Sequence, residues 1–162
     1  MAKTFYLRVL VAGHADLVCE VRKAEAERFR RRLETPEGHG RFFWFDTIDG
    51  RSLIVNLDHV QGVRFLWDVA AAPPNTRLSR NEDMTIAFAG RPLLAEPPSE
   101  DEAEIYGLFR DLELDDDEAV TFTDFDGEQF SLLSGQVVYI SAPKDVVDEG
   151  RRQAEAEDGA SE

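Results

Sequence analysis

Residues 7–66 of this chain align without a gap on residues 84–143, a shift of 77 positions, and ten aligned pairs are identical. A chain of ordinary composition gives roughly four matches at one such shift. The matches fall at turn and core positions: an Ala-Gly pair closes an apolar run in each half, and an Asp-Gly pair separates two more. We therefore expect two copies of one unit, because a shared scaffold keeps its turns and core.

The spacing of apolar residues predicts the order strand, strand, helix, strand, strand, strand in each half. The first helix is expected at 23–34, and the Asp-Gly pair at 49–50 forms a hairpin turn. The second helix is expected at 100–112, with Ser99 and Glu102 as a capping box. The predicted fold class is α+β: tandem duplicated β-rich units, each of about five strands and one helix, packed as a pseudo-twofold single domain.

Breaks in this pattern set the predicted boundaries. Residues 1–68 form the first repeat and 84–143 the second. Between them, residues 69–83 are rich in Ala, Pro and Asn and predict a linker. Residues 144–162 are polar and acidic, and we expect a disordered acidic tail or, in the alternative, a weakly helical one.

Composition limits the classes of function. The net charge of −15 argues against general affinity for nucleic acid or anionic membranes, which need basic surface. With one cysteine, Cys19, no intramolecular disulfide can form, so we expect a cytoplasmic protein, with no stretch long enough for membrane insertion. The excess of Arg over Lys, with many Ala, Asp and Glu residues, is typical of a bacterial genome rich in GC.

A second pattern starts from Arg41 and ends at Leu112: a strand, an Asp-Gly hairpin, a bend, a further hairpin and a helix. The residues that carry it are Asp49, Gly50, Val55, Asn56, Asp58, Val60, Gly90, Ser99 and Glu102. With these features the segment resembles small bacterial FlbD-type flagellar-associated proteins. The resemblance implies a non-enzymatic accessory or regulatory protein. In this alternative, 41–112 is one module, and the segments 4–33 and 119–142 pair to form the second.

No motif in the sequence predicts catalysis, a metal or a cofactor. The run Asp-Phe-Asp-Gly-Glu at 124–128 has carboxylates spaced as in a calcium loop, but position 12 of that loop would be Gly135, which has no ligand. We interpret it as a hairpin turn. The three histidines lack the spacing of a zinc site, and Cys19 is expected to be a buried structural thiol.

Charge is distributed unevenly between the two expected helices. Residues 22–32 hold six basic and two acidic residues, whereas residues 96–128 hold one Arg and 14 acidic residues. A charged run of this kind is commonly a solvated helix face. The alternative is that the basic helix binds an acidic surface, within the chain or on a partner. The candidate partner-binding residues are Arg28, Arg30, Arg31 and Arg32.

The hairpin around residues 49–50 is apolar on both faces. Alternation places Phe43, Phe45, Leu53 and Val55 inward. The outward face carries Phe42, Trp44 and Ile54, where the second half has Ala119, Thr121 and Ser131. An exposed patch of this kind marks a contact site. In the alternative, the N-terminal strand, a helix or the linker covers it.

These features favour a non-catalytic protein-interaction or regulatory module of the bacterial cytoplasm. It would act through a sheet face and charged helices, on another protein or by self-association. The acidic stretch supports an alternative, an acidic nucleic-acid mimic that inhibits a DNA- or RNA-binding protein. A second alternative is an enzyme with an unrecognised carboxylate site.

Overall fold

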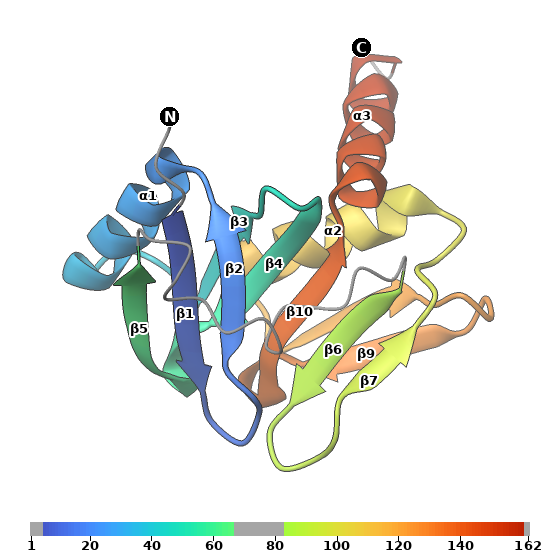
Figure 1. Ribbon diagram of the computed structural model, residues 1–162. Helices are drawn as coiled ribbons and strands as arrows, with labels where there is room; N and C mark the ends of the chain where they lie inside the picture. Colours follow the sequence, from blue (N-terminus) through green and yellow to red (C-terminus); the bar gives the residue numbers. More distant parts are fainter. Residues whose placement is uncertain (1–4, 67–82, 161–162) are drawn as a thin grey trace.

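Ten strands and three helices make up the computed structural model over the residues that it describes, 5–66 and 83–160 (Figure 1). The first half contains β1 (Phe5–Val11), β2 (Leu17–Val21), α1 (Lys23–Glu34), β3 (Phe42–Asp46), β4 (Arg51–Asn56) and β5 (Val60–Leu66). The second contains β6 (Met84–Phe88), β7 (Leu94–Glu96), α2 (Glu102–Leu114), β8 (Ala119–Thr123), β9 (Gln129–Leu133), β10 (Val137–Pro143) and α3 (Lys144–Ala160). The fold class is α+β, as predicted. The linker expected at 69–83 lies outside the described residues, except for Asp83.

The order of elements in the first half returns in the second, and so do the turns. Gly13 and Gly90 have φ of 76° and 77°, and Gly50 and Gly127 have φ of 90° and 79°. These glycines close the four hairpins with a left-handed backbone that other residues rarely adopt. Backbone hydrogen bonds recur at the same shift: Ala12–His59 with Ala89–Gln136, and Leu57–Arg41 with Ser134–Glu118. That the halves arose by duplication stays a prediction.

The central sheet mixes strands of both halves. Sheet B has the order β3-β4-β10-β6-β7, so β10 of the second half lies between β4 and β6. Sheet A has the order β2-β1-β5, and β8 and β9 form a separate hairpin, sheet C. All neighbouring strands are antiparallel. One row of paired residues crosses sheet B, namely Trp44, Ile54, Ile140, Ile86 and Leu94.

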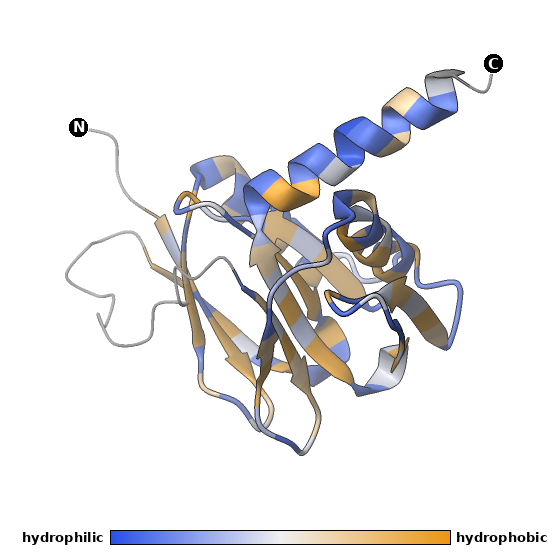
Figure 2. Cartoon of the chain, turned by 90° about the vertical axis from the view of Figure 1, so that its right-hand side faces the viewer, coloured by the Kyte–Doolittle hydropathy of each residue, from blue (hydrophilic) through white to orange (hydrophobic). Residues whose placement is uncertain are grey.

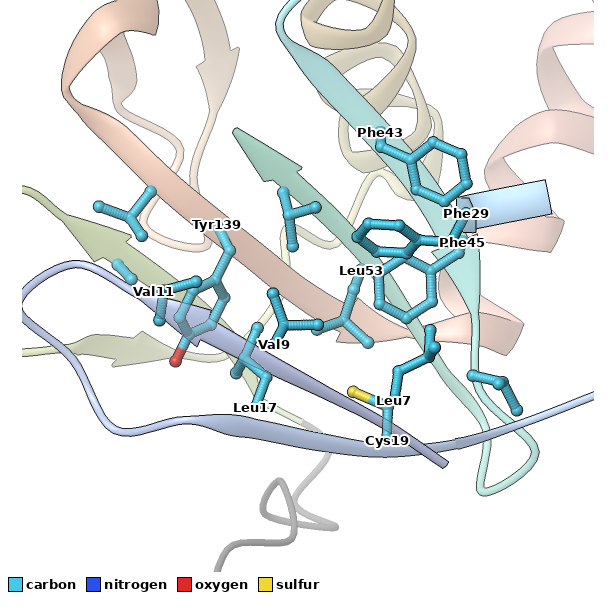
Figure 3. Close-up of a cluster of buried hydrophobic side chains, with 14 of the residues drawn as sticks. Leu7, Val9, Val11, Leu17, Cys19, Phe29, Phe43, Phe45, Leu53 and Tyr139 are labelled. Carbon is cyan, nitrogen blue, oxygen red and sulfur yellow. The ribbon is translucent and has the colours of Figure 1, made fainter. Parts of the chain in front are cut away.

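Sheet B separates two hydrophobic cores, which explains why β4 and β10 are apolar on both faces. On one face, α1 and sheet A enclose the first core, where Figure 3 shows Phe29 of α1 with Phe43 and Phe45 of β3. On the other face, α2, sheet C and the start of α3 enclose the second. Every residue of β4 and of β10 is buried as a result.

The disordered tail predicted for 144–162 is wrong, and the helical alternative holds over Lys144–Ala160, which forms helix α3. Its start packs on α2: Val147 is fully buried, and Gly150 lies directly against the backbone of Glu102. Figure 2 shows that its most apolar residues lie near its beginning, while the rest of the helix extends away from the fold. The apolar stripe of α3 is short, so the polar composition of the whole segment did not indicate an amphipathic helix.

The capping box predicted at the start of α2 is also wrong. The helix begins at Glu102, and its N-cap is Asp101, whose side chain accepts a hydrogen bond from the N–H of Ala103. The hydroxyl of Ser99 instead accepts from the N–H of Asp101 at 3.3 Å. An Asp at the N-cap satisfies the same free donors as a Ser does.

Candidate partner-binding groove

Strand β3 forms one edge of sheet B and lies between two helices. Its inward residue Phe43 packs on Phe29 of α1, with ring centroids 4.6 Å apart. Its next residue, Trp44, turns to the opposite face and packs on Phe109 of α2 at 5.3 Å. The free edge of the strand therefore runs between α1 and α2.

The apolar face of β3 and β4 is covered, so of the two alternatives for this face, exposed or covered, the exposed one is wrong. Phe42 is 3% exposed and Ile54 is 0% exposed, and Trp44 is half-buried. The cover is α2, with Arg151 of α3 stacked 5.2 Å from the Trp44 ring. The second of the two alternatives therefore holds, because a helix packs on this face.

A groove with a volume of about 620 Å³ follows the edge of β3 between the two helices. The side of α1 contributes Arg28, Arg31 and Arg32, and the loop after it contributes His39. Glu113 near the end of α2 forms part of the opposite wall. The groove is thus basic on one side, in a chain whose net charge is −15.

Two of the arginines reach the backbone beside the groove. Arg28 donates a hydrogen bond to the carbonyl oxygen of Trp44, and Arg32 donates one to the carbonyl oxygen of Gly40. Arg31 stays mostly in solvent, with a side chain 75% exposed and 3.9 Å from Glu27. Of the four predicted arginines these three come together, whereas Arg30 stacks on Phe65 outside the groove.

Sequence reasoning missed Glu25, which completes the contact between α1 and the strand edge. Its Oε2 accepts a hydrogen bond from the N–H of Asp46 at 3.0 Å, and both carboxylate oxygens accept from Arg28 at 3.1 Å. Burial opposes ionisation, but the hydrogen bonds from Arg28 and Asp46 lower the pKa of Glu25 below its usual range. The spacing of Glu25 and Arg28 along one helix face was the available signal.

A second missed feature, the ion pair between Arg41 and Asp115, holds the loop at the end of the groove. Asp115 accepts three hydrogen bonds from Arg41, from the backbone N–H at 2.8 Å, from Nε at 3.0 Å and from Nη2 at 2.8 Å. Its side chain is 8% exposed, and its φ is 52°. These hydrogen bonds lower the pKa of Asp115. Arg41 and Asp115 lie 74 residues apart in the sequence, so no local sequence pattern predicts their pairing.

Burial shifts the pKa of other titratable side chains among the described residues. Partial burial raises the pKa of Glu113, against the opposing charges of Arg28 and Arg151. Burial also raises the pKa of the Cys19 thiol. Across residues 5–66 and 83–160, no three His, Cys, Asp or Glu side chains gather as a metal site would require. In the same described ranges, no helix combines the length and apolar character needed to cross a membrane.

Comparison of the chain with protein-family models, with curated proteins and with solved structures gave no match.

Proposed function

We propose that this chain is a non-catalytic protein-interaction module, and that its basic groove binds an acidic segment of a partner protein. The observation that carries the proposal is the convergence of Arg28, Arg31, Arg32 and His39 along one strand edge. Guanidinium groups bind carboxylates through paired, charge-assisted hydrogen bonds. A regulatory role in a bacterial cytoplasm, as the resemblance to FlbD-type proteins implies, is compatible with such binding.

The remaining charge of the chain favours local recognition over general attraction. At a physiological ionic strength, charges further apart than about 8 Å are largely screened. An acidic segment inside the groove therefore experiences the nearby arginines more than the distant acidic surface. Arg31 is the best placed to bind, because its side chain is 75% exposed and its contact with Glu27 is long, at 3.9 Å.

The test uses the full chain and a fluorescein-labelled peptide of ten glutamates, with a peptide of ten glutamines as the neutral control. We expect fluorescence anisotropy to detect binding of the glutamate peptide only. The variant Arg31→Glu should weaken this binding by about tenfold or more, because it reverses a charge in the groove. The matched variant Arg30→Glu makes the same charge change on the same helix outside the groove, and should retain binding.

Two results would refute the proposal. The first is that the glutamate peptide binds no better than the glutamine peptide. The second is an equal loss of affinity in Arg30→Glu and Arg31→Glu, which would indicate attraction to the whole helix surface rather than binding in the groove.

The acidic nucleic-acid mimic remains a second candidate, because exposed acidic residues cluster on the surface after α2. Asp116, Asp117 and Glu118 are all exposed there. This candidate predicts a salt-sensitive complex with a basic, nucleic-acid-binding protein, which nucleic acid would displace. Reversal of Asp116 and Asp117 to Lys should weaken that complex, whereas Arg31→Glu should leave it intact.

A further inference from the structure

The hydrogen-bonding pattern of β3 shows which backbone groups face the groove. In an antiparallel pair, residues alternate between those bonded to the neighbouring strand and those whose N–H and C=O point away. Arg41 and Thr47 are bonded across to Leu57 and Arg51, respectively. By alternation Phe43 and Phe45 are bonded to β4 as well. Phe42, Trp44 and Asp46 therefore point their backbone groups outward.

Side chains of α1 satisfy part of this edge and leave part of it free. Arg28 occupies the carbonyl of Trp44, and Glu25 occupies the N–H of Asp46. In the described part of the chain, the N–H and C=O of Phe42 and the N–H of Trp44 have no hydrogen-bond partner. Phe42 lines the groove and is only 3% exposed, so its two groups lie low on the floor of the groove. Buried backbone groups without partners are uncommon and costly in a folded protein.

We propose that the acidic segment binds as an additional strand on β3, with its backbone bonded to Phe42 and Trp44. This inference rests on the proposed function and specifies the form of its partner. Addition of an extended peptide to a free sheet edge is a general mode of recognition, in which the backbone supplies affinity and alternate side chains supply specificity. The added strand donates to the carbonyl oxygen of Trp44 in place of Arg28, whose guanidinium group then binds a carboxylate of the segment, while Glu25 keeps the N–H of Asp46.

The two walls of the groove then dictate the pattern of the bound segment. Neighbouring residues on adjacent strands point to the same face of a sheet. Partner residues beside Phe43 point toward α1, where carboxylates meet Arg28, Arg31 and Arg32. Partner residues beside Phe42 and Trp44 point toward α2, where the charges of Glu113 and Arg151 oppose each other and give acidic side chains no net attraction. The partner is therefore an extended segment of about five residues in which acidic and uncharged residues alternate.

The experiment compares three seven-residue peptides with blocked ends against the full chain. The first is Thr-Glu-Val-Glu-Val-Glu-Thr. The second has the same composition in blocks, Thr-Glu-Glu-Glu-Val-Val-Thr. The third is the alternating peptide with both valines N-methylated, which removes the donors on the edge beside Phe42 and Trp44. We expect the alternating peptide to bind about tenfold or more tightly than either of the others.

Amide hydrogen exchange supplies a readout that charge attraction does not affect. On addition of the alternating peptide, exchange at Phe42 and Trp44 should slow by about tenfold or more. Exchange at Phe43 and Phe45, which are already bonded to β4, should change little. Equal binding of all three peptides, without protection at Phe42 and Trp44, would overturn strand addition and leave the proposed function standing. Absence of binding by any peptide carrying Glu would overturn both.

Discussion

Replacement of Gly150 by Ala tests the packing of α3 on α2, because close packing predicts that the variant is less stable rather than more stable. A Cβ at position 150 would lie 2.1 Å from the carbonyl oxygen of Glu102 and 2.8 Å from Cβ of Tyr106. Normal contacts between such atoms are about 3.5 Å, so the helices must separate by roughly 1 Å. The obstacle is backbone, which cannot rotate aside. The separation would loosen Val147 in the second core and Arg151 against Trp44.

The expected magnitude is a balance of two effects. Overpacking of this kind lowers the free energy of unfolding by about 1–3 kcal/mol. The higher helix propensity of Ala raises it by about 1 kcal/mol. We therefore expect Gly150→Ala to lower the free energy of unfolding by up to about 2 kcal/mol, measured by urea denaturation with circular dichroism. The control is Gly107→Ala in α2, where a Cβ meets nothing within 4 Å. That variant should gain up to about 1 kcal/mol, and a Gly150→Ala protein that gains as much would refute the close packing.

Two further predictions concern single groups. Asp115→Asn should cost about 2–3 kcal/mol of stability at neutral pH, because Asn tolerates the φ of 52° but no longer pairs with Arg41. Arg41 lowers the pKa of Asp115, so the extra stability of the wild type over this variant is complete above the ordinary pKa of about 3.9. It disappears as the pH falls through the lowered pKa. A difference in stability that persists undiminished in strong acid would contradict the pairing. Cys19 is buried with a raised pKa, so a thiol reagent should label it only as the protein unfolds in urea, and rapid labelling of the native protein would show that the site is open.

Local pattern was sufficient for most of the fold, because strands and turns have short-range causes. The alternation in β3 and β4, and the Asp-Gly pairs that adopt positive φ at Gly50 and Gly127, follow from neighbouring residues. The insertion of β10 between β4 and β6 could not be predicted in this way. Those strands are apolar on both faces, so alternation does not say which strand lies beside which.

The groove was only partly predictable for the same reason. The run of basic residues identified Arg28, Arg31 and Arg32, but the position of Arg30 depends on Phe65, far away in the sequence. Whether Phe42, Trp44 and Ile54 are exposed or buried depends on whether α2 packs on them. The sequence shows that these residues are apolar, but it does not show which element covers them.

A comparison of equivalent residues in the two halves distinguishes contacts that both halves share from contacts that occur only at the groove. Glu25 is the third residue of α1 and binds the N–H of Asp46, and Glu104 is the third residue of α2 and binds the N–H of Thr123. Asp46 and Thr123 end the equivalent strands β3 and β8. Both halves therefore use one glutamate to hold the strand edge against the helix.

The two arginines that bond to the backbone of β3 and of the loop before it, Arg28 and Arg32, have no such counterpart. Counted from the two glutamates, Arg28 corresponds to Gly107 and Arg32 to Asp111 in α2, and only Arg31 has an equivalent, Arg110. Because the second half forms the same helix and strand without them, Arg28 and Arg32 are not required by the architecture that the halves share. A basic wall that the scaffold does not need, beside backbone groups that it leaves unpaired, is the arrangement expected of a binding site.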